Sequence, residues 1–441
     1  MNYHQIYKSA YFFQYKLAFC SLLFILTGTL VASEVIKVEI IKNNDSYQLL
    51  RGGKSYVVKG AGLEFGDITS LASHGGNSIR NWSTTNDKAP AQELLDQALA
   101  HGVTVSLCLE MKLERWGFDY NDRDLVAAQF EKIHDEVLKY RNHPALLTWI
   151  IGNELNHSYS NAKVYDAVND ISKMIHELDP NHPTTTTLSG LDATVLNDVN
   201  TRATDLDFIS FQVYGQLDIL PKFIKQTGYT KPFMVTEWGA VGYWEMEKTS
   251  WGSSIEMNSS EKAQNYLRGY QIKLKSLEKQ LLGSYAFLWG QKQERTPTWF
   301  GLFTETGEET EAVDVMHYIW NGNWPVNRSP TLVSMFLDSR PARQYISLKS
   351  GNHYEATVNA FDHEDDALSY LWEVKFESDA NQVGGDFEED IQSLSKLIDK
   401  PNAQKINIKT PSQAGAYRLF VYIYENQGHA AHANIPFYVS D

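Results

Sequence analysis

Between residues 56 and 322 the chain alternates short apolar runs with stretches in which apolar residues recur at helical spacing. The apolar and β-branched runs predict eight strands, at 56–62, 77–82, 103–109, 147–151, 184–188, 207–214, 233–236 and 283–289. Apolar residues at helical spacing predict helices at 126–137 and 164–178, of which the second is the clearest in the chain, and a helix closed by Gly102 is predicted at 92–100. Helices at about 216–227, 260–281 and 309–320 are expected to fill the remaining gaps between strands. Eight strand–helix units over roughly 260 residues are the size and pattern of an α/β fold, the (β/α)8 TIM barrel.

A doubly wound open sheet is the alternative that the same alternation allows. Such a sheet usually carries a glycine-rich phosphate-binding turn where its first strand leads into a helix. Here Gly60-Ala61-Gly62 leads into Leu63-Glu64-Phe65-Gly66, which opens no helix. The barrel is therefore the preferred prediction.

The segments on either side of the barrel follow a different pattern. Residues 36–60 predict a hairpin whose turn is Arg51-Gly52-Gly53-Lys54. Residues 330–441 carry short strand signals separated by Gly, Asn and Asp, which predict an Ig-like β-sandwich with Trp372 in its core. We therefore expect a barrel catalytic domain with an N-terminal hairpin over 34–325 and an accessory sandwich over 330–441. The sandwich is expected to add stability or spacing and no catalytic residue.

Residues 1–33 predict an export signal. Lys8 and Lys16 precede the apolar run 17–31, and Val31-Ala32-Ser33 offers small residues for cleavage. A membrane anchor is the alternative, but the run is shorter than the ~20 apolar residues of a spanning helix. A secreted or periplasmic protein with no stable membrane insertion after cleavage is expected. Cys108 is then the single remaining cysteine, and its apolar neighbours predict a small buried hydrophobe.

Composition narrows the possible ligands. A net charge of -15 argues against nucleic acid or an anionic membrane surface as partner and favours a neutral substrate. No metal or cofactor is predicted, because the histidines lack ligand spacing such as HExxH. Asp362, Asp365 and Asp366 could hold calcium, but a solvated acidic turn is the preferred interpretation.

Two carboxylates stand where predicted strands end. The run 147–151 leads into Gly152-Asn153-Glu154, and the run 233–236 leads into Glu237. Arg80, Tyr214 and Trp289 end three further strands. A single such residue is more often a helix cap or an ion-pair partner, but in a barrel the C-terminal strand ends form one face. The joint placement predicts one shared site, and a pair of carboxylates is what a glycosidase requires.

Five short motifs occur in order along the predicted barrel. They are Gly76-Asn77-Ser78-Ile79-Arg80, Trp149-Ile150-Ile151-Gly152-Asn153-Glu154, Val213-Tyr214-Gly215, Thr236-Glu237-Trp238-Gly239 and Leu288-Trp289-Gly290. Over roughly residues 55–322 the chain resembles the clan A glycoside hydrolases, and the TIM-barrel catalytic domain of family 2 is the nearest match. The resemblance implies a retaining enzyme with Glu154 as acid/base and Glu237 as nucleophile. It further implies that Asn153 holds the sugar 2-hydroxyl, that Arg80 and Tyr214 orient Glu237, and that Trp289 floors a subsite.

Physical chemistry is consistent with these implied roles. A guanidinium and a phenol beside Glu237 would stabilise its charged form, and the apolar strand behind Glu154 would favour its neutral acid. For the retaining pair we expect carboxyl groups ~5 to 5.5 Å apart, against ~6.5 to 9.5 Å in an inverting enzyme.

Tryptophans at or just beyond the strand ends predict a surface for several sugar units. They are Trp82, Trp116, Trp238, Trp244, Trp251, Trp289 and Trp299, of which Trp82, Trp244, Trp289 and Trp299 are the substrate-binding candidates. The rim cations Lys112, Arg115, Lys292 and Arg295 alternate with glutamates, as in a mixed rim and not an anion track.

We expect a secreted retaining β-glycoside hydrolase that cleaves a neutral β-linked polysaccharide, with an endo-acting β-1,3-glucanase preferred. A β-glucan transglycosylase and an exo-acting β-galactosidase or β-mannosidase are alternatives within enzymes. A carbohydrate-binding scaffold protein is the alternative from another class.

Overall fold

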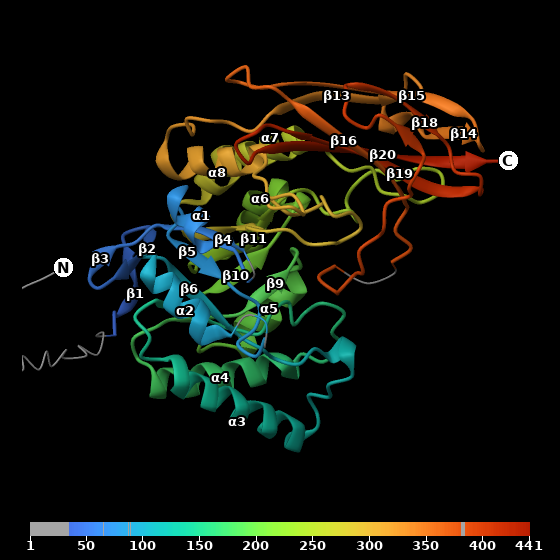
Figure 1. Ribbon diagram of the computed structural model, residues 1–441. Helices are drawn as coiled ribbons and strands as arrows, with labels where there is room; N and C mark the ends of the chain where they lie inside the picture. Colours follow the sequence, from blue (N-terminus) through green and yellow to red (C-terminus); the bar gives the residue numbers. More distant parts are fainter. Residues whose placement is uncertain (1–34, 65, 87, 89, 381–383) are drawn as a thin grey trace, which may run out of the picture. The chain divides into compact units, whose positions relative to one another are not determined.

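The computed structural model describes residues 35–64, 66–86, 88, 90–380 and 384–441, so the predicted export signal lies outside the described residues. Eight strand positions form the barrel, and all of its neighbouring strands are parallel (Figure 1). In chain order the strands are β4 (Val58–Gly62), β5 (Ser78–Arg80), β6 (Thr104–Leu109), β7 (Leu146–Ile151), β8 (Thr184–Thr185), β9 (Thr187–Ser189), β10 (Ile209–Gln212), β11 (Phe233–Gly239) and β12 (Leu281–Phe287). The predicted (β/α)8 fold is confirmed.

The fifth strand of the barrel is split into β8 and β9 by Thr186. Strand β8 pairs with β7, whereas β9 pairs with β10, and these two pairings close the ring. Thr186 bridges the gap, because its hydroxyl donates to the Ile151 carbonyl at 2.7 Å and its own carbonyl accepts from the Ser210 N–H at 3.0 Å. Hydrogen bonding therefore continues across the break, through the Thr186 side chain on the β7 side and through its backbone on the β10 side.

Helices cover the outside of the barrel. They are α1 (Ile68–Ser73), α2 (Ala91–Ala100), α3 (Arg123–Tyr140), α4 (Lys163–Leu178), α5 (Ala193–Arg202), α6 (Leu220–Thr227), α7 (Ser259–Arg268) and α8 (Glu311–Asn321). Helix α4 buries Val164, Val168, Ile171 and Ile175, the apolar face that its sequence predicts. The predicted helix 260–281 is wrong in its second half, where a π-helical segment (Gly269–Leu274) and a 3₁₀ turn (Lys275–Leu277) follow α7.

A three-stranded antiparallel sheet precedes the barrel, made of β1 (Val38–Asn43), β2 (Ser46–Arg51) and β3 (Lys54–Ser55). The predicted Arg51–Lys54 turn joins β2 to β3, and the hairpin turn between β1 and β2 lies instead at Asn44-Asp45. Val38 and Leu49 share an apolar cluster with residues at or beside the N-terminal ends of five barrel strands, which are Val58, Leu147, Phe208, Met234 and Leu282. The sheet therefore covers the end of the barrel opposite to the C-terminal strand ends.

The C-terminal residues form the predicted β-sandwich. One sheet has the order β13-β15-β18-β17 and the other the order β14-β20-β19-β16. Their strands are β13 (Thr331–Leu337), β14 (Ile346–Lys349), β15 (His353–Phe361), β16 (Ser369–Phe376), β17 (Ile398–Asp399), β18 (Lys405–Lys409), β19 (Gly415–Tyr424) and β20 (Ala430–Ser440). Trp372 is buried in the core between the sheets, as its sequence context predicts.

A buried polar cluster joins the sandwich to the barrel. The Asn434 amide of β20 donates to Glu256 at 2.6 Å, and the Arg418 guanidinium of β19 donates to the Ser254 carbonyl at 2.9 Å. Glu256 also pairs with Lys262 of α7, and neither side chain is exposed by more than 6%. Residues 35–441 accordingly form one compact unit. Among the described residues, none of the helices combines the length and apolarity that crossing a membrane requires.

Candidate active site

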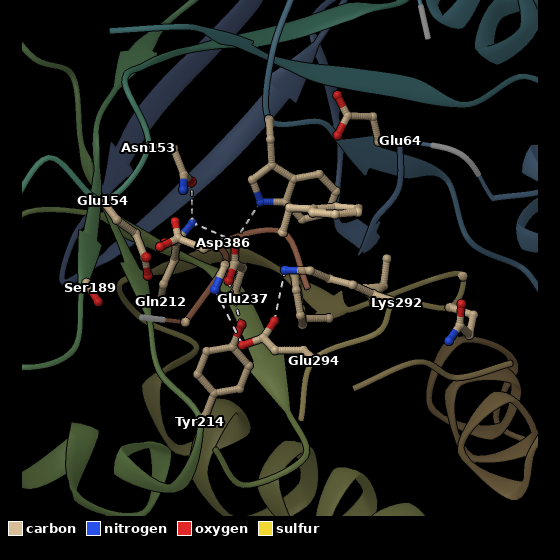
Figure 2. A pocket seen from close by; sticks show the side chains of 18 of the residues that line it. Glu64, Asn153, Glu154, Ser189, Gln212, Tyr214, Glu237, Lys292, Glu294 and Asp386 are labelled. Carbon is tan, nitrogen blue, oxygen red and sulfur yellow. Dashed lines mark hydrogen bonds and ion pairs between the residues drawn. The ribbon is translucent and has the colours of Figure 1, made fainter. Parts of the chain in front are cut away.

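A cavity of about 1640 Å³ lies at the C-terminal ends of the barrel strands (Figure 2). Six of the nine predicted site residues line it, namely Trp82, Asn153, Glu154, Tyr214, Glu237 and Trp244. Arg80 lies directly behind the wall, fully buried and bonded to two of the six. The structure thus brings seven of the nine together, whereas Trp289 and Trp299 are not part of the wall.

Glu237 of β11 is surrounded by hydrogen-bond donors. Its Oε1 accepts from Arg80 Nη1 at 2.5 Å, from Trp82 Nε1 at 2.9 Å and from Gln212 Nε2 at 3.0 Å, while Oε2 accepts from the Tyr214 hydroxyl at 2.6 Å. Figure 2 shows Gln212 and Tyr214 next to Glu237. Four donors, one of them a cation, stabilise the carboxylate in its charged form.

Asn153 is held by the same donors. Its Oδ1 accepts from Arg80 Nη2 at 2.8 Å and from Gln212 Nε2 at 2.9 Å. Because its oxygen is occupied in this way, the Nδ2 amide is the group that Asn153 can offer to a substrate hydroxyl.

Glu154 is carried by a backbone turn in the left-handed region. Gly152 has a φ of 71° and Glu154 a φ of 50°, and the Glu154 N–H donates to Thr187 Oγ1 at 2.9 Å. Burial of the carboxyl, together with the negative charge of Glu237, raises the pKa of Glu154 to about 8. The raised pKa favours the protonated form of Glu154, while the hydrogen bonds to Glu237 hold that carboxyl group in a fixed position.

Trp289 and Trp299 are buried, which corrects the prediction that they contact substrate. Trp289 is fully buried. Its ring centre lies 5.5 Å from that of Trp320 of α8 and 5.3 Å from that of Phe303. The Trp299 indole donates to the Val241 carbonyl at 2.9 Å and packs against Tyr243. The side chain after a strand end can point inward or outward, and here both point into packing contacts behind the wall. Leu288 and Gly290 line the cavity in place of Trp289.

The remaining rim tryptophans are also divided between residues exposed in the cavity and residues packed elsewhere. Trp116 and Trp244 line the cavity and are 64% and 47% exposed. Trp238 is fully buried against Tyr266, and Trp251 packs on Tyr438 of the sandwich. Two exposed indoles therefore remain at the cavity beside Trp82.

Sequence reasoning missed two groups at this site and placed a third, Glu294, only as a glutamate of the mixed rim. Gln212, the last residue of β10, bonds both Asn153 and Glu237, and its position at the end of a buried strand was a signal that could have found it. Glu294 is 3% exposed and pairs with Lys292 at 2.8 Å (Figure 2). Residues 384–387 of the sandwich also line the cavity, and no sequence pattern indicates that contact.

The rim cations are all paired with acids or backbone oxygens. Lys112 pairs with Glu110, Arg115 with Asp386 and Lys292 with Glu294, and Arg295 donates to the Ala380 carbonyl. Arg115 and Lys292 are the cations among the described residues that line the cavity, against many carboxylates. The rim therefore offers no track of unpaired positive charge to a polyanion.

No group of three or more His, Cys, Asp and Glu side chains in the described part of the chain is arranged to hold a metal ion. Asp362 Oδ1 accepts from the backbone N–H groups of Glu364 and Asp366 at 2.9 Å each, which is the geometry of an acidic turn.

Residues 67–272 match the family described as glycosyl hydrolases family 2, TIM barrel domain. No curated protein matches the chain. Among solved structures, Bacteroides uniformis beta-glucuronidase 2, covalently bound to cyclophellitol-6-carboxylate aziridine, is 14% identical with a TM-score of 0.51, and the match covers 91% of this chain and 48% of that one. The Bifidobacterium dentium beta-glucuronidase complexed with coumarin-3-O-glucuronide is 17% identical with a TM-score of 0.50, covering 65% and 49%.

The chain thus spans about half the length of these solved structures, and at such identities the likeness concerns the fold. Residues 67–272 of the barrel are thus similar to the TIM-barrel domain of the family 2 glycosyl hydrolases. The predicted resemblance to the clan A glycoside hydrolases is confirmed.

Proposed function

We propose that this protein is a retaining β-glycoside hydrolase in which Glu237 attacks the anomeric carbon and Glu154 serves as acid and then base. The observation that carries the proposal is the contrast between the two glutamates of one cavity. Glu237 accepts four hydrogen bonds that favour the carboxylate, whereas the pKa of Glu154 is raised to about 8 by burial and by the charge of Glu237. Different environments for two identical side chains are how such a site acquires both a nucleophile and an acid.

The catalytic cycle follows from these environments. In the first half, the Glu237 carboxylate bonds to the anomeric carbon while Glu154 gives its proton to the departing oxygen. In the second half, Glu154 takes a proton from water, whose oxygen displaces Glu237 and restores the free enzyme. If a sugar hydroxyl replaced water, the same residues would catalyse transglycosylation.

The substrate that we propose is a neutral β-linked glycan, with endo-acting cleavage of β-1,3-glucan preferred. Paired rim cations and a carboxylate-rich wall support a neutral chain over a uronate polymer. The exposed indoles of Trp116 and Trp244 suit the apolar faces of pyranose rings. Exo-acting β-galactosidase or β-mannosidase activity is the alternative.

The mechanism is tested with an activated aryl β-glycoside. Wild-type turnover with retained anomeric configuration in the product, followed by NMR, is expected. The Glu237→Ala variant should be inactive and should regain turnover with azide, giving a product of inverted configuration. An inverted product from the wild-type protein would overturn the retaining mechanism, and sugar binding with no turnover of any β-glycoside would favour a binding protein.

The substrate is tested with a panel of neutral and acidic β-glycans whose products are sized by mass spectrometry. Release of oligosaccharides from a neutral polymer is expected. Monosaccharide release alone would reject endo action, and activity confined to uronic acid glycosides would reject the charge argument. We also propose export to the periplasm or medium with cleavage after residue 33, which N-terminal sequencing of the mature protein tests.

A further inference from the structure

A segment of the sandwich forms part of the cavity wall. Residues 384–387 lie between β16 and β17, far along the chain from the barrel, and all four line the cavity. Asp386 appears among the lining side chains in Figure 2. This contact places a second domain at the site where the barrel carries its two glutamates.

The segment is fixed to barrel loops on both of its sides. The Arg115 guanidinium donates to both Asp386 oxygens, at 2.8 and 3.1 Å, and the pair is 13% and 21% exposed. The Gly385 N–H donates to Glu294 at 3.4 Å, and Glu388 accepts from the Arg295 N–H at 2.8 Å. A bidentate, partly buried ion pair between arginine and a carboxylate is stronger than a single-bonded surface pair, so the segment has a defined position.

Each residue of this ion pair is followed in the chain by an exposed aromatic residue, Trp116 after Arg115 and Phe387 after Asp386. Trp116 is 64% exposed, and the Arg115 guanidinium lies 4.8 Å from its ring centre, which supports one face of the indole. Phe387 is 79% exposed and lines the same cavity. Two aromatic faces beside a fixed carboxylate match the chemistry of a pyranose, which has apolar C–H faces and hydroxyls at its edge.

The pair lies on the Glu154 side of the cavity. The turn Glu114–Trp116 is tied to the loop after Glu154, because Glu114 accepts from the backbone N–H groups of Ser160 at 2.7 Å and Asn161 at 3.0 Å. His157, three residues after Glu154, also lines the cavity. Burial and the positive charge of Arg115 lower the pKa of His157, and the negative charge of Asp386 opposes that shift. In the proposed function Glu154 gives its proton to the leaving group, so this side of the cavity receives the sugar that departs.

We propose that Trp116, Asp386 and Phe387 form a subsite for a sugar unit on the leaving-group side, built jointly by the barrel and the sandwich. The inference rests on the proposed function and deepens it. It assigns the sandwich a part in selecting glycan chains over glycosides with small leaving groups. The occupant is a neutral pyranose of the chain being cleaved, because the carboxylate of Asp386 can accept from sugar hydroxyls while Arg115 neutralises its charge.

The test separates leaving groups with and without a sugar at this position. Trp116→Ala and Phe387→Ala are each expected to lower kcat/KM on neutral β-linked oligosaccharides of three to six units by about 5- to 50-fold. Both variants should lower kcat/KM on an aryl β-monoglycoside by less than on the oligosaccharides, because an activated aryl group departs readily without the contacts that a sugar makes in the subsite. Phe361→Ala is the matched control, because Phe361 is a 47% exposed ring of the sandwich in β15 that does not line the cavity.

Binding without turnover provides a second measurement. The Glu237→Ala protein, with and without Trp116→Ala, is titrated with hexasaccharides of β-1,3-glucose, β-1,4-glucose, β-1,4-mannose and β-1,4-galactose. Weaker binding of at least one hexasaccharide in the double variant is expected. Equal affinities, or no binding of any of the four, would overturn the subsite. Loss of the proposed function would look different, as the wild-type protein would fail on aryl glycosides of every sugar.

Discussion

At the scale of single residues, the chemistry of the site depends on the different surroundings of two identical carboxyl groups, Glu154 and Glu237. Arg80, Gln212 and Tyr214 converge on Glu237, while Glu154 has an apolar strand behind it and a negative charge in front of it. The chemistry that we propose needs one group charged and the other protonated before substrate binds. Each contribution can be tested through a single side chain.

The pH dependence of activity should reflect Glu154. Its raised pKa, about 8, means that the carboxyl is protonated below that pH and loses its proton as the pH rises through it. We therefore expect kcat/KM on an unactivated β-glycoside to fall on the alkaline side near this value, and Glu154→Gln to lack this limb and most of the activity. A profile that already falls between pH 4 and 6 on its alkaline side would show that Glu154 has no raised pKa.

Tyr214→Phe should reduce turnover without destabilising the protein. The change removes one charge-assisted hydrogen bond to Glu237, which is 2.6 Å long, and we expect kcat/KM to fall about 10- to 100-fold. Tyr159→Phe is the matched control, since its hydroxyl also donates to a carboxylate, Asp198 at 2.9 Å, and Tyr159 does not line the cavity. Equal losses of activity in the two variants would mean that the Tyr214 bond has no special role.

Residue positions at strand ends were predictable from sequence, but side-chain directions were not. Apolar runs that end in polar residues located Glu154, Glu237, Arg80 and Tyr214, because buried strands deliver their last residues to one face of the barrel. Trp289 was placed in the same way and is buried against α8. Whether a residue just past a strand points into the cavity depends on the local backbone path, which composition and spacing do not determine.

At the scale of elements, apolar periodicity predicted what is long and regular. Helix α4 buries the face that its apolar spacing predicts, whereas α1 has six residues of which two are buried, too few for a clear period. The split of the fifth strand at Thr186 also has no sequence signal, since 184–188 reads as one β-branched run. Backbone geometry matters most where β7 delivers Glu154 through the left-handed turn at Gly152.

Gly152→Ala should impair activity more than stability. A Cβ at Gly152 would lie 2.7 Å from the Leu155 side chain, and its φ of 71° costs a residue with a side chain about 1 kcal/mol. The turn must shift, and Glu154 with it, so we expect turnover to fall at least tenfold. Gly228→Ala is the matched control, with a φ of 66° and no atom within 4 Å of the added Cβ. Thermal melting should show a small loss for Gly228→Ala and a larger one for Gly152→Ala, because only the second variant adds a steric clash. An active Gly152→Ala protein would reject the positioning role.

At the scale of the whole molecule, the sandwich is more than an appendage to the barrel. Sequence predicted its strands and its core Trp372, because alternation and turn residues are local signals. Its contacts with the barrel are non-local and were not predictable. They include the Asn434–Glu256 bond, the Arg418–Ser254 bond and the cavity wall at residues 384–387.

Truncation after Asn327, which removes the sandwich, should therefore unfold the remaining barrel. Helix α7 packs against β13 and β20, and the Ser259 and Ser260 hydroxyls accept from the backbone N–H groups of His432 and Leu332. Removing the sandwich takes away the Asn434 partner of Glu256 and uncovers the face of α7 that packs on β13 and β20, which is a large loss of burial for a domain held folded by roughly 5–15 kcal/mol. We expect the truncated protein to lose cooperative thermal melting and near-UV circular dichroism.

A milder change separates unfolding from loss of the cavity wall. Asp386→Ala removes the Arg115 partner but leaves the buried Glu256 cluster in place, so the full-length variant should melt within a few degrees of the wild type. If the truncated barrel instead melted cooperatively near the wild-type temperature and turned over aryl glycosides normally, the sandwich would be dispensable for folding, and its contacts at residues 384–387 would bear on substrate selection alone.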